Sequence, residues 1–322
     1  MIDAALERWT SQTMESRIVR YADLRPCFNA FVDTRSPGSE AKENFTIIGP
    51  GVSENPEQHV HIAEPHGFNI GGARQPPGCV NSQHSHDTAE VFVVHSGRWR
   101  FDLGEHGEDA QVELHPGDVI SLPTRMFRGF TNIGDDSGFL WAVLGGDDPG
   151  RVTWAPAVFD LARDHGLVLL ESGKLIDTVK GQAPGPGERP MARTSAEQVA
   201  ALRRMTPAEA ERIVVRQREG ARGETALIGE EAPLGGGHGF NLSRLDLVAR
   251  ETVERARRDG VEVVFVQHGL LEFSWDGGRT ELGVGDTLTV PTGLARSFRA
   301  GPDGAAAFVV RDGDRMPELY AA

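Results

Sequence analysis

Residues 83–97 read QHSHDTAEVFVVHSG, and this stretch decides both the fold and the site. Side chains at alternate positions of an extended strand share one face, so His84 and His86 point the same way. Glu90 keeps the same parity and returns to that side after a short bend. Two imidazoles and one carboxylate that converge on a point are typical of a divalent-metal site, and open positions at such a site suit non-haem iron. The sequence therefore predicts a metal site at His84, His86 and Glu90.

Short strands separated by turns surround this stretch. The chain has 39 glycines and 19 prolines, which favours many turns over a helical bundle. From Phe68 to about Trp141, short apolar runs are punctuated by turn residues, and Trp99, Phe101 and Leu103 alternate with polar residues. Closely spaced short strands with turn signals are typical of an all-β sandwich or barrel.

The second half of the chain repeats the first. The tetrapeptide His66–Asn69 recurs as His238–Asn241, 172 residues later (66 to 238). Further matches keep this offset or, after a four-residue deletion, an offset of 168: Glu90 with Glu262, Gly97 with Gly269, Gly117 with Gly285, Pro123 with Pro291, and Arg128 with Arg296. The sequence thus predicts two copies of one β domain.

These motifs resemble those of the cupin superfamily. The first cupin motif, G-x5-H-x-H-x3-E-x6-G, is filled at the right spacings by Gly78, His84, His86, Glu90 and Gly97. The second, G-x5-P-x-G-x2-H-x3-N, is degraded. Gly117, Pro123 and Asn132 fit it, but Arg125 replaces the glycine and Arg128 the last histidine. The resemblance covers residues from about 60 to 145 and 235 to 311, and implies an all-β fold of two tandem cupin (jelly-roll, or double-stranded β-helix) barrels.

The expected organisation has four parts. They are an N-terminal arm (1–58), an N-terminal barrel with the metal site (59–176), a linker with helices (177–222), and a C-terminal barrel without metal ligands (223–322). Short helices are expected over Met1–Val19, Val158–His165 and Ser195–Met205, the last capped by Ser195.

Arg128 changes what the resemblance implies for the metal. In the family, the metal lies inside the barrel, bound by two histidines, the glutamate and the final histidine. Arginine cannot take that last place because its guanidinium stays protonated. The ligands then reduce to His84, His86 and Glu90, which leaves roughly three octahedral positions for water, substrate or dioxygen.

Two interpretations of Arg128 stay open. Its guanidinium can contact a substrate carboxylate, since this fork binds carboxylates through two hydrogen bonds. Arg296 occupies the same place in the second copy, however, so the arginine can also be architectural and pair with Glu90 or Glu262.

The second copy lacks the ligands. Ala256 and Arg258 stand at the two histidine positions, and only Glu262 remains, so we expect no metal there. In the first half, His59 and His61 form another H-x-H, but no carboxylate follows at the right distance. We do not expect these two histidines to be ligands.

The leading hypothesis is a metal-dependent enzyme, most simply an Fe(II) dioxygenase that acts on a small organic acid or phenol. Mn(II), Zn(II) or Ni(II) at the same ligands would instead act as a Lewis acid for isomerase, decarboxylase or lyase chemistry. A third hypothesis is a non-enzymatic protein that binds a small molecule, and a fourth is a decayed metal site with buried histidines. The sequence contains no serine-hydrolase elbow, P-loop or placed dinucleotide fingerprint.

Composition limits the partners. The formal net charge of −14 leaves no basic surplus to neutralise phosphates, so no nucleic-acid partner is expected. No apolar run approaches the roughly 18 to 20 residues that span a bilayer, and the first residues do not have the pattern of a signal peptide. Two cysteines are too few for a disulfide scaffold. We expect a cytoplasmic protein with a small-molecule substrate and, as in the bicupins that it resembles, a homodimer.

Overall fold

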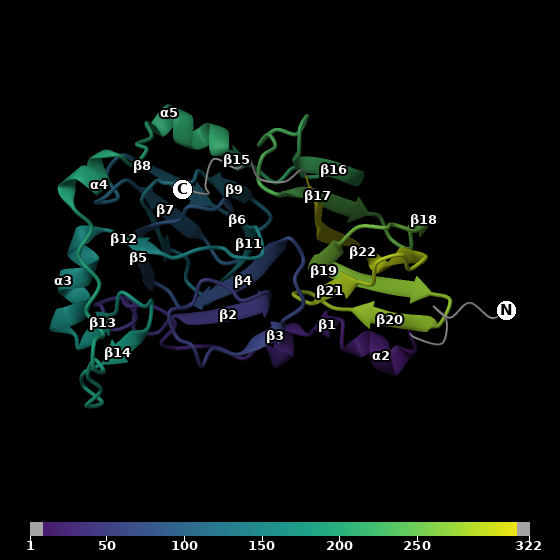
Figure 1. Cartoon of the computed structure of the whole chain (residues 1–322). Coiled ribbons are helices and arrows are strands. Elements are labelled where there is room, and N and C mark those ends of the chain that lie inside the picture. Colours follow the sequence, from purple (N-terminus) through teal and green to yellow (C-terminus); the bar gives the residue numbers. More distant parts are fainter. Residues whose placement is uncertain (1–8, 314–322) are drawn as a thin grey trace. The chain divides into compact units, whose positions relative to one another are not determined.

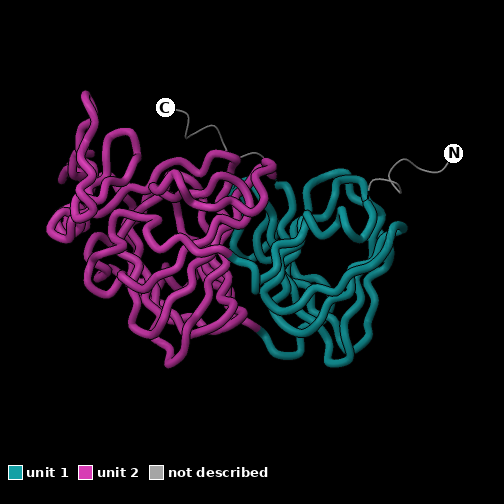
Figure 2. The backbone as a smooth tube through the Cα atoms, turned by 90° about the horizontal axis from the view of Figure 1, so that it is seen from below, with its two compact units in different colours: residues 1–24, 218–319 teal, residues 25–217, 320–322 magenta. Residues whose placement is uncertain are grey.

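A computed structural model describes residues 9–313 of the chain. These residues form a mostly β structure with a few short helices (Figure 1). They divide into two compact units, drawn in different colours in Figure 2. The N-terminal unit contains residues 25–217, and the C-terminal unit combines residues 9–24 with residues 218–313. The fold is two tandem β-barrels, as the sequence predicts.

The N-terminal barrel consists of two sheets. A seven-stranded sheet has the order β15-β9-β6-β11-β4-β2-β3, and a five-stranded sheet has the order β12-β5-β10-β7-β8. The strands are β2 (Glu43–Ile48), β3 (Val60–Ile62), β4 (Phe68–Gln75), β5 (Val80–Ser85), β6 (Glu90–Ser96), β7 (Trp99–Leu103), β8 (Ala110–Leu114), β9 (Val119–Leu122), β10 (Arg128–Asn132), β11 (Gly138–Gly145), β12 (Thr153–Trp154) and β15 (Val214–Val215).

The core of this barrel lies between the two sheets, because each contributes one face of its strands. On β7 the buried positions are Trp99, Phe101 and Leu103, whereas the two residues between them are partly exposed. This is the alternation that the sequence predicts for a strand with one buried face. The same core cluster receives Phe92 from β6 and Leu140 from β11 in the other sheet.

A second apolar cluster lies beside the barrel. It includes residues of α3 (Pro156–Asp164) and of the hairpin strand β13 (Leu167–Leu169), which pairs with β14 (Leu175–Asp177). Proline stands in the first turn of α3, where its missing N–H costs nothing. Gly166 follows with a positive φ of 79° and ends the helix. The helix predicted over Val158–His165 is therefore present, shifted by one or two residues.

The linker helix is shorter than predicted. α4 spans only Ala196–Ala200, although Ser195 caps it through the predicted capping box with Gln198. The chain leaves the helical path because the backbone N–H of Arg203 donates to the carbonyl of Arg125. Two short elements then lead back to the barrel, α5 (Pro207–Ala210) and the 3₁₀ helix η2 (Glu211–Ile213).

The residues predicted as one N-terminal arm (1–58) do not form a single part of the structure. Residues 1–8 of the predicted Met1–Val19 helix lie outside the described residues, and α2 covers only Ser11–Glu15. Strand β1 (Ile18–Val19) then pairs with β21 of the C-terminal unit, and the 3₁₀ helix η1 (Tyr21–Asp23) follows it. Strand β2, in contrast, lies inside the seven-stranded sheet of the N-terminal barrel. The contacts thus divide the chain near residues 24 and 217, not at the expected boundaries, because strand pairing draws the two ends of this segment into different sheets.

The C-terminal unit has one eight-stranded sheet. Two long strands, β19 and β22, cross-pair over most of their length and so hold the barrel together. The strands are β16 (Gly223–Ile228), β17 (Phe240–Leu247), β18 (Thr252–Ala256), β19 (Glu262–Trp275), β20 (Gly278–Leu282), β21 (Thr287–Val290) and β22 (Arg296–Asp312).

The strand registers confirm the duplication. In the N-terminal barrel Glu90 pairs with Leu122, and in the C-terminal barrel Glu262 pairs with Val290. Both residues of the second pair lie at the offsets that the sequence repeat predicts. The turn hydrogen bonds repeat as well: Gly117 donates to the carbonyl of Val94, and Gly285 to that of Val266, each at 2.7 to 2.8 Å.

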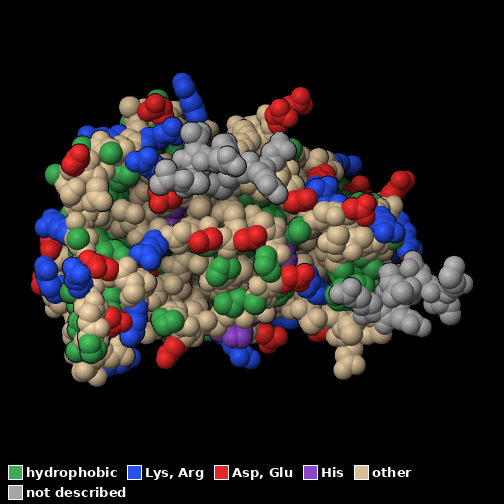
Figure 3. Space-filling model, in the orientation of Figure 1, with side chains coloured by type: hydrophobic (Ala, Val, Ile, Leu, Met, Phe, Trp, Pro, Cys, Tyr) green, Lys and Arg blue, Asp and Glu red, His purple; other side chains and the backbone are tan. Residues whose placement is uncertain are grey.

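Charged side chains of both signs are interspersed on the face shown in Figure 3. This is consistent with a chain that has 33 basic and 47 acidic residues. Within residues 9–313, no helix has both the length and the apolar character needed to cross a membrane.

Gly269 gives a test of the C-terminal barrel. It has a φ of 74°, and a Cβ there would lie 2.2 Å from the carbonyl oxygen of Gly304. We expect Gly269→Ala to lower the free energy of unfolding by about 2–4 kcal/mol, since it adds a backbone clash to the left-handed conformation. Gly235→Ala is the control, because Gly235 has a φ of 71° but open space around it; its cost should be about 1 kcal/mol. Equal losses in urea unfolding would contradict the close approach.

Candidate metal centre

Four residues predicted for the site come together inside the N-terminal barrel. His84 lies on β5, His86 follows that strand, Glu90 begins β6 and Arg128 begins β10. Arg128 pairs with His84 in the register of β10 and β5. Glu90 lies two residues before the core residue Phe92 on the same strand, so it points into the barrel. All four residues are buried, with 4% exposure or less.

The two histidines and the glutamate form a compact group. Their donor atoms all lie within 4.8 Å of one another, and this is the one such group in the described part of the chain. Nε2 of His86 is 3.6 Å from Oε1 of Glu90. Two ligands each ~2.1 Å from one ion are at most ~4.2 Å apart, so this pair fits one ion, and the donor atom of His84 lies within 4.8 Å of both.

The protonation of the histidines suits metal binding. Nδ1 of His84 is 2.7 Å from the carbonyl oxygen of Ser82, and since a carbonyl only accepts, Nδ1 carries the proton and Nε2 keeps its lone pair. Burial lowers the pKa of His84 to about 3, and the charge of Arg128 adds to this. The same two causes hold the pKa of His86 well below its ordinary value. Both rings are therefore neutral near pH 7, the form that binds metals.

Arg128 forms an ion pair with Glu90. Its Nε and Nη2 donate to Oε2 of Glu90 at 3.1 and 2.7 Å, and its Nη1 donates to the carbonyl of Met126 at 3.1 Å. Burial raises the pKa of Glu90, and Arg128 opposes that shift. Because the guanidinium is permanently charged and fully buried, the pair is compensated only when Glu90 is ionised. Oε1 of Glu90 is then the oxygen left for a metal.

The geometry favours the architectural interpretation of Arg128. Three of its five N–H groups donate to Glu90 and Met126, and it is absent from the residues that line the adjacent cavity. The C-terminal barrel repeats the pair: Arg296 donates to Oε1 of Glu262 from Nε at 2.9 Å and also from Nη2. A second arginine, Arg311, donates to Oε2 of the same glutamate at 2.9 Å.

Arg125 keeps the backbone conformation of the motif glycine that it replaces. Its φ is 55°, in the left-handed region where an L-residue costs roughly 1–2 kcal/mol. Its N–H donates to the carbonyl oxygen of His86 at 2.8 Å. This hydrogen bond holds the backbone next to one histidine of the cluster.

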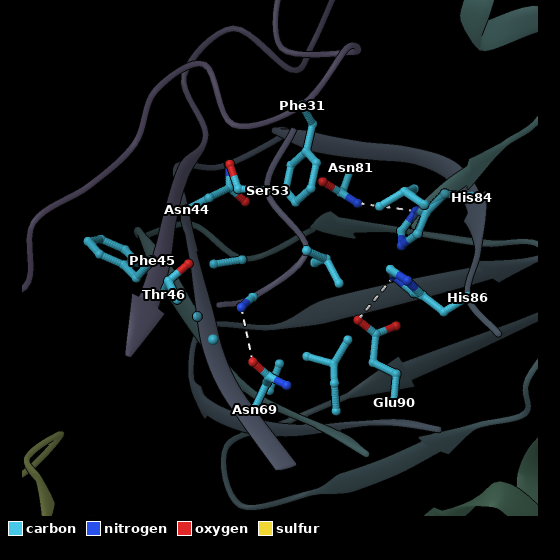
Figure 4. Close-up of a pocket in the computed structure, with 18 of the residues that line it drawn as sticks. Phe31, Asn44, Phe45, Thr46, Ser53, Asn69, Asn81, His84, His86 and Glu90 are labelled. Atoms are coloured by element: carbon cyan, nitrogen blue, oxygen red, sulfur yellow. Dashed lines mark hydrogen bonds and ion pairs between the residues drawn. The ribbon is translucent and has the colours of Figure 1, made fainter. Parts of the chain in front are cut away.

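A cavity of about 70 Å³ lies against the cluster. Figure 4 shows His84, His86 and Glu90 on one side of it, and Asn44, Thr46 and Asn69 on the other. Its apolar walls are mainly aromatic and aliphatic: Phe31, Phe45, Phe92, Phe130, Leu144 and Trp154. A small organic molecule in this cavity would lie beside the metal ligands.

Residues 31–58, the wall segment, close this cavity. Phe31, Asn44, Phe45, Val52 and other residues of the wall segment are part of its lining. The sequence predicts this segment as part of an arm (1–58) outside the barrel, and that prediction does not include its role at the cavity. Its strand was visible in the apolar run at residues 45–48, but a polar residue turned into a barrel, such as Asn44, gives no local signal.

Buried polar groups fix the wall segment beside His84. Glu54 accepts the backbone N–H of Val32 and the indole N–H of Trp154, both at 2.6 Å. The ring of Trp154 in turn lies 5.4 Å from that of His84. A fully buried ion pair between Asp33 and Lys42 joins the same region. These contacts tie the wall segment to the metal-site strands.

The two histidines expected not to be ligands have other roles. Nδ1 of His61 is 2.7 Å from the carbonyl of Thr46, and its Nε2 accepts the N–H of Arg25 at 3.1 Å. The His59 ring lies against His61 at 4.6 Å. In the C-terminal barrel, Ala256 pairs with Arg296 as His84 pairs with Arg128, so the ligand position is occupied by a methyl group.

The fold and the cluster define a double-barrel protein with one interior candidate site for a divalent metal. Residues 73–144 match the family model described as "Cupin domain". The N-terminal barrel thus contains a cupin domain, and the chain has the fold of two tandem cupin barrels.

Known proteins are similar over parts of the chain or in fold. Germin-like protein subfamily 1 member 7 of Arabidopsis thaliana is 34% identical over 88 residues, which are 26% of this chain and 38% of that protein. Member 4 of the same subfamily is 27% identical over 121 residues, 35% of this chain and 54% of that protein. This chain thus spans about half or less of these relatives. An 11S globulin from Wrightia tinctoria has a TM-score of 0.55 at 13% identity and covers 94% of this chain and 85% of its own. An 11S allergen from Cocos nucifera has a TM-score of 0.55 at 16% identity, over 87% of both chains.

The Glu90–Arg128 pair can be tested by its removal. Arg128→Met leaves Glu90 buried without a partner, so we expect the N-terminal unit to lose about 3–5 kcal/mol of unfolding free energy. Arg296→Met should cost less, because Glu262 keeps Arg311. The double variant Glu90→Gln/Arg128→Met should recover part of the loss. Urea unfolding measures all three, and an equal loss at Arg128 and Arg296 would contradict the difference between the barrels.

Glu54 predicts a pH dependence of stability. Burial raises its pKa from 4.5 to about 8, so between these values the folded protein keeps a proton that the unfolded chain has lost. The stabilisation by protonated Glu54 is complete below about pH 4.5 and is lost as the pH rises to about 8. We expect the unfolding free energy of the wild type to fall more steeply from pH 5 to 9 than that of Glu54→Gln, by up to ~1 kcal/mol per pH unit. Parallel pH profiles would refute this assignment.

Proposed function

We propose that the N-terminal barrel is a metal-dependent enzyme, an Fe(II) dioxygenase that acts on a small organic molecule. One observation carries the proposal: His84, His86 and Glu90 are buried together and border a cavity with largely apolar walls. A facial set of two histidines and one carboxylate with open positions is typical of non-haem Fe(II) oxygenases. A bound ion would supply a centre at which substrate and dioxygen meet.

The protein's own residues have distinct tasks in this proposal. His84 and His86 offer neutral nitrogens, and Glu90 offers Oε1 alone, because Arg128 occupies Oε2. Arg128 orients Glu90 and compensates its charge, and it adds to the burial that lowers the pKa of both histidines. The aromatic walls restrict water around the site. A role for Arg128 as a clamp for a substrate carboxylate stays a prediction, which its pairing with Glu90 and its absence from the cavity lining do not favour.

The same donor set supports an alternative. Mn(II), Zn(II) and Ni(II) also bind imidazole and carboxylate ligands, and each would act as a Lewis acid in isomerase, decarboxylase or lyase chemistry without consuming dioxygen. A purely binding function, without catalysis, is the remaining alternative. The identity of the metal and the uptake of oxygen separate the three.

Metal content tests the site directly. We expect protein purified without chelator to hold about one divalent ion per chain by mass spectrometry, and His84→Ala or His86→Ala to reduce the content at least tenfold. His115→Ala is the matched control, because that histidine is exposed and outside the cluster. Substoichiometric metal in the wild type that is unchanged in His84→Ala would remove both enzyme hypotheses.

Oxygen uptake tests the reaction class. Protein reconstituted anaerobically with Fe(II) should consume dioxygen with at least one member of a panel of small hydroxy acids, diketones and phenols, and the His86→Ala variant should not. Turnover of a panel member without oxygen uptake would assign the Lewis-acid class instead.

Two expectations about the whole protein stay proposals. The first is a homodimer, which light scattering coupled to size exclusion tests by a mass near twice 34.9 kDa. The second is a cytoplasmic location, which cell fractionation tests.

A further inference from the structure

Six uncharged polar side chains line the cavity: Asn44, Thr46, Ser53, Gln58, Asn69 and Asn81. Four of them are engaged by the protein. Asn69, for example, accepts the N–H of Gly51 and donates to the carbonyl of Gly146, and Asn81 accepts from Lys42.

Asn44 and Gln58 differ from the other four. Nδ2 of Asn44 has no hydrogen-bond partner among the described residues, although the side chain is more than nine-tenths buried. The amide of Gln58 donates to Thr46 at 2.5 Å, and its other end is buried and unpartnered. Buried polar groups without partners are uncommon in proteins and call for an explanation. Because both border the cavity, a ligand group is the simplest partner for them.

The strand register directs Asn44 into the cavity. On β2 and β4, Asn44 lies opposite Ala73 and Thr46 lies opposite Gly71, and directly opposed residues share a sheet face. Ala73 belongs to the barrel core, so Asn44 and Thr46 point to the interior. Figure 4 shows both on the side of the cavity away from His84 and Glu90.

The charges in the cavity are confined to the metal side. Among its described lining residues, Glu90 is the one carboxylate and no lysine or arginine is present. Lys42 is buried nearby, but it is committed to Asp33 and Asn81. A substrate carboxylate near Asn44 would therefore be buried without a counter-charge, which is strongly unfavourable.

The size of the cavity restricts the ligand further. Its volume of about 70 Å³ is roughly half that of a ~150 Å³ cavity that accepts benzene. This favours a compact acyclic molecule over a substituted ring, and so narrows the substrates considered under the proposed function.

From these observations we infer that the cavity selects a small acyclic substrate. Its metal-binding end faces His84, His86 and Glu90. Its distal end is an uncharged hydrogen-bonding group that Asn44 and Gln58 hold. A carboxamide or hydroxyl meets this requirement, and a second carboxylate does not. Asn44 and Gln58 are then specificity-determining residues. The inference rests on the proposed metal site and names the class of substrate for it.

Three hydroxamates test this inference by calorimetry on zinc-loaded protein, which is inert to dioxygen. Acetohydroxamate probes the metal end alone. N-hydroxymalonamide adds a distal carboxamide, and malonate monohydroxamate adds a distal carboxylate of nearly the same shape. We expect the carboxamide probe to bind at least tenfold more tightly than the carboxylate probe.

Substitutions test which residues cause the preference for the carboxamide probe. Asn44→Leu and Gln58→Met, which are close in shape, should each weaken the carboxamide probe three- to tenfold and leave acetohydroxamate within twofold. Gln75→Met is the matched control. Gln75 is a fully buried amide on β4 whose two side-chain polar atoms also have no partner, but it does not line the cavity. It should change the affinity of none of the probes.

The outcomes separate this inference from the proposed function. Zinc uptake and acetohydroxamate binding that both require His84 support the metal site, and their failure removes the proposed function together with this inference. If they succeed, the inference is overturned when the carboxylate probe binds as tightly as the carboxamide probe. It is also overturned when neither Asn44→Leu nor Gln58→Met alters carboxamide binding.

Discussion

The buried ion pair between Glu90 and Arg128 is the constraint on which the N-terminal barrel depends. A permanently charged guanidinium with no exposed surface requires a carboxylate beside it, so the start of β6 and the start of β10 must meet at one place. The pair leaves Glu90 a single free oxygen and places a positive charge next to two histidines, which adds to the effect of burial in lowering their pKa. The open, three-ligand character of the candidate metal site follows from this one contact. Its repetition at Glu262 and Arg296 shows that the pair belongs to the barrel itself, whereas the two histidines are present in one copy only.

Around this pair, the cavity combines parts of very different origin in the chain. The metal side comes from β5 and β6, with Trp154 of β12 next to His84, whereas much of the opposite side comes from the wall segment. Glu54 joins the wall segment to Trp154, and Trp154 lies against His84. A change in the wall segment therefore acts on the ring of a candidate ligand through two contacts, which couples the shape of the cavity to the metal site.

Much of this arrangement could be predicted from the sequence, and the reason for each success and failure is physical. His84 and His86 are two residues apart at the end of β5, and Glu90 follows after a short turn at the start of β6, so their closeness in sequence was enough to predict the cluster. The duplication and the Glu90–Arg128 contact followed from residues that recur at constant offsets. The place of Asn44 in the cavity wall could not be inferred, because it depends on the long-range pairing of β2 with β4. The helix expected to reach Met205 ends at Ala200 for a similar reason, since a tertiary hydrogen bond at Arg203 competes with its helical one.

The match to the cupin domain ends at residue 144 and begins at residue 73, yet the cavity is completed by residues on both sides of that span. Under the proposed function, the metal ligands and much of the wall that would select the substrate thus lie in separate stretches of this chain. Substitutions in the residues that precede the first motif can change which molecules fit the cavity, while His84, His86 and Glu90 stay unchanged. Proteins that share residues 73–144 with this one can therefore share a type of chemistry without sharing a substrate.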